Sequence, residues 1–283
     1  MFIDTHAHLD YPDYKDDLED VIARATDAGV SRILTIGTGL ESSRRAVALA
    51  ERFPPVFAVV GIHPTNVAAE PRDFFESLQE IATHPKVAAI GETGLDYHHL
   101  PGKQLQPPEA LQALGCEFPG EPEGAVLDGA YKAIQTQTFL QHLDLAIKLN
   151  LNVVIHQRDA WEDTLQCLEP YHKRLRCVFH CFGETAERAM QVIEQGHLVS
   201  FTGIVTFKNA SNVRSTVAGI PDNGYMLETD CPYLAPMPYR GKRCEPAYVR
   251  EIAEVISQVR GQNLDALARQ TTTTAEAFFR LPD

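Results

Sequence analysis

The 283-residue sequence has no uninterrupted apolar run that approaches the length of a membrane span. A bilayer helix needs roughly 18 consecutive apolar residues, and charged residues, proline or glycine interrupt every hydrophobic stretch here. Basic residues are also absent from the N-terminus before Lys15, whereas four aspartates lie within the first 16 residues. A secretory signal has the opposite pattern. We therefore expect a protein of the cytoplasm that does not cross a membrane.

The sequence also lacks an excess of positive charge. It contains 25 lysines and arginines against 38 aspartates and glutamates, which gives a formal net charge of −13. Nonspecific binding of nucleic acids depends mainly on Lys and Arg, so the composition disfavours a large surface that grips phosphates. A nucleic acid would therefore have to bind at a local site.

Cysteines are too few, in a chain of this length without an export signal, to indicate a disulfide framework. The six are Cys116, Cys167, Cys177, Cys181, Cys231 and Cys244. Cys177 and Cys181 flank a histidine, which suggests a thiolate zinc site. Strand alternation instead predicts that both sulfurs point toward a helix layer as small hydrophobes. We expect reduced thiols that do not bind metal.

Short β-branched apolar runs alternate with longer segments of helical periodicity, the pattern of repeated βαβ units on a parallel sheet. We predict eight strands, at residues 2–8, 32–37, 56–63, 87–92, 152–156, 177–182, 197–203 and 225–230. Helices are predicted between them, for example at 18–29, 41–53, 73–83, 138–150 and 185–196. The first strand runs into THAHLD rather than a GxGxxG turn, which argues against an open doubly wound sheet. The sequence therefore predicts an α/β fold, a (β/α)8 TIM-type barrel that forms a single domain over residues 1–283.

One predicted connection is abnormally long. Residues 99–130 are rich in Pro and Gly and follow the fourth predicted strand, whereas an ordinary loop has about 4 to 6 residues. In a (β/α)8 barrel this insertion falls at the carboxyl-end face, where active sites form. Two interpretations stay open: a lid or substrate-selecting wall, and a disordered surface insertion.

Histidines and carboxylates occur at or near the ends of five predicted strands. His6 and His8 stand two residues apart in the first strand, so both imidazoles project from one face, about 7 Å apart. The groups near the ends of the fourth, fifth, sixth and eighth strands are Glu92, His156, His180 and Asp230. On a barrel these ends share one rim, and strand alternation turns the side chains inward. For the other histidines, a hydrogen-bonded core or surface role is the default.

Four imidazoles and two carboxylates are too many ligands for one tetrahedral ion that keeps an open position. They suffice for two divalent ions that share a carboxylate and a water. Two cations about 3.5 to 4 Å apart convert the shared water to hydroxide and polarise a carbon or phosphorus centre, so no serine or cysteine nucleophile is required. Asp230 is the candidate for accepting the proton of that water. We therefore predict a hydrolytic centre with two metal ions.

Six segments resemble the TatD family of metal-dependent hydrolases and occur in the same order along the chain. They are DTHAHLD at 4–10, GIHP at 61–64, GETGLDYH at 91–98, IHQRDA at 155–160, FHCF at 179–182 and ETDCPYLAP at 228–236. The resemblance covers nearly the whole chain and leaves mainly the Pro-rich insertion unmatched. It implies a (β/α)8 barrel of the amidohydrolase type and a metal-dependent deoxyribonuclease or phosphoesterase activity, often with 3′-to-5′ exonuclease character.

The resemblance also assigns roles to residues by position. It implies that one ion is held by His6, His8 and Asp230, that a second is held by His156 and His180, and that Glu92 bridges them. Glu92 and Asp230 are then the catalytic groups. A glutamate, rather than a carbamylated lysine, at the bridging position points to the TatD branch of amidohydrolase-like barrels. His63 is expected to approach the substrate phosphate, with further substrate-site candidates at Arg158 and Glu228.

The sequence is compatible with more than one metal and more than one substrate. Imidazole ligands favour Zn, Mn or another first-row ion, whereas the resemblance implies Mg. DNA, as ends or single strands, is the expected substrate, with local phosphate contacts from Arg158, Lys208, Arg240, Lys242 and Arg243. The alternatives are a two-metal hydrolase of a small amide, lactone or phosphate ester, and a catalytically silent binding protein. Gln157 and Cys244 depart from the family pattern and bear on substrate choice. We infer no obligate protein partner.

Overall fold

A computed structural model describes residues 1–101 and 124–282 of the chain. Its eight strands form one sheet in sequence order. They are β1 (Phe2–Ala7), β2 (Val30–Ile36), β3 (Val56–Val60), β4 (Val87–Asp96), β5 (Asn152–Arg158), β6 (Cys177–Phe179), β7 (Leu198–Phe201) and β8 (Tyr225–Leu227). Each strand pairs in parallel with the next.

The sheet closes on itself between its first and last strands. Ala7 forms a parallel bridge with Cys231. Beside it, Asp230 N donates to His6 O at 2.8 Å and His8 N donates to Cys231 O at 2.8 Å. The predicted (β/α)8 barrel is therefore confirmed.

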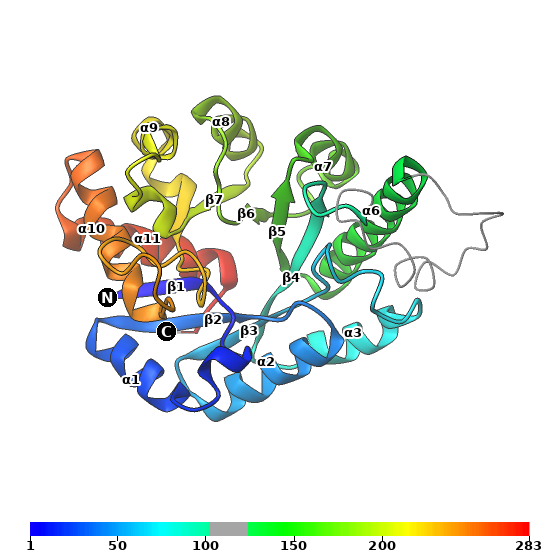
Figure 1. The fold of residues 1–283 in the computed structure, drawn as a ribbon, viewed down its shortest axis with the longest axis horizontal. Coiled ribbons are helices and arrows are strands. Elements are labelled where there is room, and N and C mark those ends of the chain that lie inside the picture. The colour runs from blue at the N-terminus through cyan, green and yellow to red at the C-terminus, as the bar shows by residue number, and fades with distance from the viewer. Residues whose placement is uncertain (102–123, 283) are drawn as a thin grey trace.

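Helices surround the strands (Figure 1). They are α1 (Leu18–Asp27), α2 (Leu40–Arg52), α3 (Phe74–Ala82), α6 (Gly124–Leu149), α7 (Trp161–Leu168), α8 (Ala186–Glu194), α9 (Ser211–Gly219), α10 (Val249–Arg260) and α11 (Leu264–Phe279). Short 3-10 turns lie at Pro12–Tyr14, Glu169–Tyr171, Gly203–Thr206, Asp222–Gly224 and Pro246–Tyr248. None of the helices in the described part of the chain is both long enough and apolar enough to cross a bilayer.

Each helix packs because one of its faces is apolar. In α1, the buried residues Leu18, Val21, Ile22 and Ala25 follow the i, i+3, i+4, i+7 spacing of one helical face. These side chains join the outward-facing side chains of the strands, such as Ile33, in one core cluster between the sheet and the helices. The helix layer is thereby fixed to the outside of the barrel.

A second apolar cluster fills the inside of the barrel. It combines Leu34, Val154 and Val178 from the strands with Phe278 and Phe279 at the end of α11. The first residue of β5, Asn152, also donates a hydrogen bond to the carbonyl of Phe278. The end of α11 therefore covers the amino end of the barrel, and polar groups are left to the carboxyl end.

The predicted boundaries differ from the observed ones for most strands, and two differences bear on the site and on the insertion. Strand β4 continues to Asp96, four residues beyond the predicted end at Glu92. Helix α6 begins at Gly124, inside the predicted insertion 99–130. Residues 102–123 of that insertion lie outside the described residues, so its role at the substrate site stays a prediction.

The cysteines agree only in part with the prediction. The five in the described part of the chain are free thiols, and Cys177 is fully buried in the core between sheet and helices. The predicted direction of Cys181 is wrong, because this residue lines the cavity at the carboxyl end. Strand β6 ends at Phe179, and Cys181 adopts a left-handed conformation with φ 48°, so strand alternation no longer sets its direction.

Candidate metal centre

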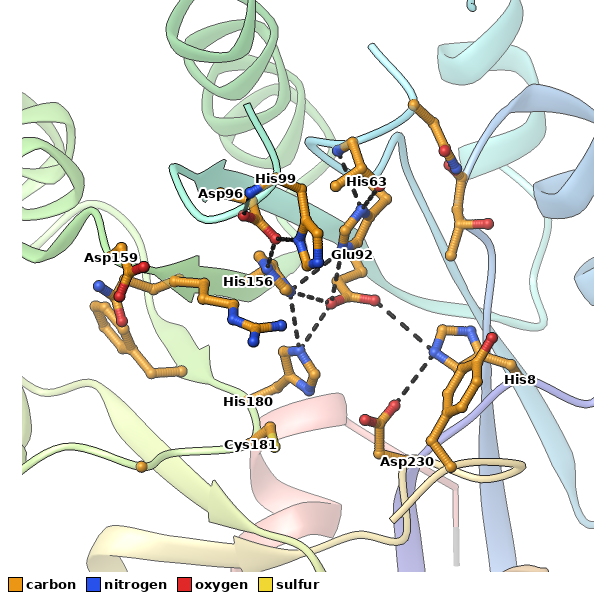
Figure 2. Close-up of a pocket in the computed structure, with 18 of the residues that line it drawn as sticks. His8, His63, Glu92, Asp96, His99, His156, Asp159, His180, Cys181 and Asp230 are labelled. Atoms are coloured by element: carbon orange, nitrogen blue, oxygen red, sulfur yellow. Dashed lines mark hydrogen bonds and ion pairs between the residues drawn. The ribbon is translucent and has the colours of Figure 1, made fainter. Parts of the chain in front are cut away.

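The structure brings all six residues predicted as metal ligands into one cluster at the carboxyl end of the barrel. Figure 2 labels all of them except His6. They come from β1 and the residue directly after it, from β4 and β5, and from the turns that follow β6 and β8. His63, in the loop after β3, lies in the same cluster. Three groups have their ligand atoms within 4.8 Å of one another: His6–His8–Asp230, His6–Glu92–His180 and His63–Glu92–His156.

Glu92 lies at the centre of this cluster, and its two oxygens face different imidazoles. Oε1 is 2.7 Å from His180 Nε2 and 2.9 Å from His156 Nδ1. Oε2 is 3.3 Å from His6 Nε2 and 4.0 Å from His8 Nε2. Burial opposes charge on this carboxyl, but the charge of His180 is among those that outweigh it and hold its pKa well below the usual range. Glu92 is therefore an ionised carboxylate placed between two sets of nitrogen ligands.

Two glycines allow β4 to place Glu92 there. Gly91 and Gly94 have φ angles of +137° and +141°, a region that residues with a Cβ rarely adopt. A Cβ on Gly91 would lie 2.5 Å from the carbonyl oxygen of Val154, and one on Gly94 would lie 2.0 Å from that of His156. The pairing of β4 with β5 also shifts register between Ile90 and Thr93. The close approach of these strands therefore depends on the GETG sequence.

Asp230 forms the opposite side of the cluster. Its Oδ1 lies 3.3 Å from His8 Nε2 and 3.7 Å from His6 Nε2. Burial opposes ionisation of this carboxyl, but the hydrogen bond with His8 and the nearby imidazoles outweigh it and lower its pKa. Asp230 thus carries a negative charge beside His6 and His8.

The nitrogen and oxygen atoms of His6, His8 and Asp230 form a donor set that suits a metal ion. His6 Nε2 is close to both Glu92 and Asp230, yet both ring nitrogens of His6 are buried without a hydrogen-bond partner, as is Nδ1 of His8. Buried polar atoms are normally hydrogen-bonded, so these nitrogens require another partner. Imidazole nitrogens and carboxylate oxygens are ligands of Zn and Mn.

His63 was predicted to approach the substrate, but its ring lies within the cluster of predicted metal ligands. Its Nε2 is 3.2 Å from His156 Nδ1 and 3.6 Å from Glu92 Oε1, while Nδ1 is 2.6 Å from the hydroxyl of Thr65. Burial lowers the pKa of His63 to about 3, so the imidazole is neutral and its nitrogens can donate a lone pair. The geometry makes His63 a further candidate ligand.

Asp96 and His99 belong to the site but were not predicted. Asp96 Oδ2 is 3.1 Å from His156 Nε2 and 2.8 Å from His99 Nδ1. A carboxylate on the second nitrogen of a histidine fixes the orientation of the ring, a common arrangement behind metal ligands. Asp96 stands four residues after Glu92, an even spacing that would have placed both on one face had the strand been extended in the prediction.

Helix α6 fixes the two segments that carry His63 and Asp96. Gln135, whose side chain is 0% exposed, donates from Nε2 to the carbonyl oxygens of Pro64 and Asp96, both at 3.1 Å. Its Oε1 accepts from Asp96 N at 3.0 Å. One buried amide therefore ties the end of β4 to the loop after β3.

Two more side chains of α6 contact the loop after β3. His142 Nε2 accepts from Ile62 N at 3.0 Å, and its Nδ1 donates to Thr138 O at 2.7 Å. Tyr131 donates from its hydroxyl to Thr65 O at 2.8 Å. These bonds fix the backbone on both sides of His63. No feature of the sequence identified them, because polar residues on a helix are usually solvent-exposed.

Glu228 does not lie where a substrate could touch it. It is 1% exposed and is not among the residues that line the cavity. It accepts from Cys181 N at 2.6 Å and from the Ser200 hydroxyl at 2.7 Å, and its Oε1 lies 3.6 Å from His180 Nδ1. Its position, buried behind the cluster, is that of a residue which orients His180.

Of the five basic residues predicted to contact phosphate, one lines the cavity and four do not. Arg158 is exposed and lines the cavity, whereas Lys208, Arg240, Lys242 and Arg243 do not line it. Arg243 is paired with Asp17 at 2.7 Å and Glu245 at 3.0 Å. Arg240 lies over the ring of Phe207 at 4.3 Å. The expectation that the loop after β8 contributes phosphate contacts is therefore not supported for Arg243, whose charge is already neutralised.

The cluster opens into a cavity of about 1140 Å³. This exceeds the roughly 300 to 1,000 Å³ of ordinary small-molecule pockets. Its wall includes Arg158, His99 and Tyr131 on the side of β4 and β5, and Tyr11 and Tyr233 on the side of β1 and β8. The cavity is thus large enough for a substrate that extends beyond the metal cluster.

Comparison with known proteins settles the family. A model of the family described as TatD related DNase matches residues 3–280. The chain belongs to the TatD family of metal-dependent hydrolases. The uncharacterized metal-dependent hydrolase YabD of Bacillus subtilis is 36% identical over 282 residues, covering 99% of this chain and 100% of that protein. The 3′-5′ ssDNA/RNA exonuclease TatD of Escherichia fergusonii is 30% identical over 282 residues, covering 98% of each chain.

A solved structure agrees with the assignment to the TatD family. A TatD homologue of Escherichia coli has a crystal structure that matches with a TM-score of 0.84 at 27% identity, covering 99% of this chain and 98% of its own. The predicted family and barrel are confirmed, and the protein is a metal-dependent hydrolase.

Proposed function

We propose that this protein is a phosphodiesterase that degrades DNA from single-stranded 3′ ends by using two divalent ions. The observation that carries the proposal is the placement of Glu92, whose two oxygens face separate sets of imidazoles on opposite sides. A carboxylate shared in this way is the expected centre of a two-metal site. The name of the Escherichia fergusonii relative, a 3′-5′ ssDNA/RNA exonuclease, supports single-stranded nucleic acid as the substrate class, within which we propose DNA.

The ligand assignment follows the three groups of ligand atoms. We assign one ion to His6, His8 and Asp230, and the second to His156 and His180, with Glu92 between them. His63 completes the second site as a ligand or lies against the substrate. The mixed nitrogen and oxygen donors favour Mn or Zn over Mg alone.

The chain's own residues supply the rest of the chemistry. Bound divalent ions would contribute the charge that lowers the pKa of water and polarises the scissile phosphate. Asp230 is ionised, so it can accept the proton of a water molecule in the cavity. Arg158 supplies a positive charge at the exposed wall, where its guanidinium can contact a phosphate oxygen. Such a site needs no basic surface, which agrees with the net charge of −13.

The test is a comparison of substrates after the protein has been stripped with a chelator and reloaded with Mg, Mn or Zn singly. We expect 5′-labelled single-stranded DNA to give a ladder that shortens from the 3′ end, and blunt duplex DNA to be cut more slowly. Activity should vanish with the chelator and return with one or more ions. Turnover confined to a small amide, lactone or phosphate ester would instead establish the alternative hydrolase and refute the nuclease assignment.

A further inference from the structure

We infer that Tyr233, supported by Tyr11, forms a subsite that stacks the base of a nucleotide flanking the scissile phosphate. This inference rests on the proposed nuclease function and goes beyond it, because it assigns a specific part of the substrate to residues outside the metal cluster.

The two rings form a continuous aromatic wall beside the cluster. Tyr11 stacks on His8, with ring centroids 4.7 Å apart and an interplanar angle of 21°. Tyr233 meets Tyr11 edge to face at 6.2 Å and lies 6.4 Å from the ring of His8. Tyr233 is 54% exposed although it lines the cavity, so part of its ring is available to a ligand.

The cationic side chain of the cavity lining and the exposed aromatic ring stand on different sides of the cluster. Arg158 lines the cavity at the end of β5, and its neighbour Asp159 lies across the cluster from His8 and Asp230 (Figure 2). The lining near Tyr233 includes the uncharged residues Leu234 and Ile204. The phosphates of a phosphodiester are anionic and suit a guanidinium and metal ions, whereas its bases present large apolar faces. We therefore place the phosphates toward the metal cluster and Arg158, and the base against Tyr233.

The spacing agrees with this placement. His8 is a proposed metal ligand, and the centre of the Tyr233 ring lies 6.4 Å from that of His8. In a nucleotide, one sugar separates the base from the phosphate that it carries, which is a span of similar length. A base can therefore contact Tyr233 while its phosphate stays at the cluster.

Stacking of this kind accepts any base, because every base has an aromatic face. Removal of one stacking ring from a single-strand binding site costs about 1 to 3 kcal/mol, which corresponds to roughly a 5- to 150-fold loss. We expect a loss of about tenfold here, because Tyr233 offers only one partly exposed face. The preference should concern the presence of a base and not its identity.

The experiment is a cycle that removes the ring and the base separately. The substrates are a single-stranded oligonucleotide and two matched oligonucleotides that carry an abasic sugar at the 3′-terminal or the penultimate position. The proteins, loaded with the ion that supports turnover, are the wild type, Tyr233→Ala and Tyr233→Phe. We expect the wild type to show a kcat/KM about tenfold lower for one of the abasic substrates. Tyr233→Ala should show little difference among the three substrates, and Tyr233→Phe should restore the wild-type ratio.

Met237→Ala is the matched control. Met237 is 50% exposed, lies four residues from Tyr233 and is not among the cavity-lining residues. This variant should keep the wild-type preference, and thermal melting should show that all variants are folded. A base preference that persists in Tyr233→Ala, or is missing in a wild type that degrades all three substrates equally, would overturn the subsite alone. Failure of the wild type to degrade any oligonucleotide would overturn the nuclease function, and the subsite with it.

Discussion

Replacement of Gln135 by methionine tests how α6 supports the site. Methionine has nearly the same length and volume as glutamine, so Gln135→Met removes hydrogen bonds without opening a large cavity. The wild-type amide makes three of them, at 3.0 to 3.1 Å, to the backbone of Pro64 and Asp96. The variant leaves those backbone groups without their side-chain partner in a fully buried place.

The magnitude follows from those three bonds. A neutral hydrogen bond contributes about 1 kcal/mol, and a buried group that loses its partner costs about 1 to 3 kcal/mol. Partial relaxation reduces the sum, so we expect the free energy of unfolding to fall by about 2 to 4 kcal/mol. Because the same bonds fix Asp96 and the loop of His63, we also expect hydrolysis to fall at least about tenfold, since displacements near 1 Å have large effects on catalysis.

The assay is urea denaturation together with the metal-dependent rate. Gln137→Met is the control, because Gln137 is exposed on the same helix only two residues away. It should change stability by no more than about 0.5 kcal/mol. If Gln135→Met matched this control in both stability and rate, the proposed support of the site by α6 would be refuted.

Three further predictions follow from the structure. Gly94→Ala should lower the free energy of unfolding by at least about 2 kcal/mol, because the added Cβ would overlap the His156 carbonyl. Gly129→Ala, in the open part of α6, is the control and should be neutral or slightly stabilising. Equal melting temperatures of the two variants would contradict this. Burial lowers the pKa of His142 from 6.5 to about 4, so its contribution to stability is complete above about pH 6.5 and is lost as the pH falls toward 4. His142→Gln keeps an acceptor for Ile62 N. Its free energy of unfolding, measured by urea titration, should therefore fall less than that of the wild type between pH 6.5 and 4. Parallel pH profiles of the two proteins would contradict this role of His142. His156→Ala should lose bound metal and hydrolysis but keep its circular dichroism spectrum, and a rate near that of the wild type would reject its role as a ligand.

Much of the barrel could be predicted because its determinants are local. Strand alternation places Val178 inside the barrel and Cys177 outside it, as observed. The same rule places His6 and His8 on one face, and the parallel order of the strands brings their ends together. The family resemblance then supplied the roles that periodicity alone could not assign.

The failures occur where the chain stops following strand geometry. Cys181 turns into the cavity because the strand has already ended and the backbone is left-handed. Asp96 was missed for the opposite reason, since β4 continues past Glu92 with the help of two glycines. For Cys181 the error in the strand boundary became an error in side-chain direction, and for Asp96 it hid a residue of the site.

The support from α6 could not be predicted for a different reason. Gln135 and His142 lie far in the sequence from the loop after β3 that they bind. Nothing in the local pattern distinguishes them from the exposed Gln137. Long-range hydrogen bonds of a polar side chain become visible only when the packing of the helix on the sheet is known.

The most direct test of the central claim is a crystal structure of the metal-loaded protein with anomalous scattering measured at the absorption edge of Mn or Zn. We expect two peaks within the cluster, on the two sides of Glu92, each about 2.0 to 2.3 Å from its ligands. One peak should contact His6, His8 and Asp230, and the other His156 and His180. Peaks absent from this cluster in crystals of active protein, or a single ion that does not contact Glu92, would contradict the proposed two-metal centre.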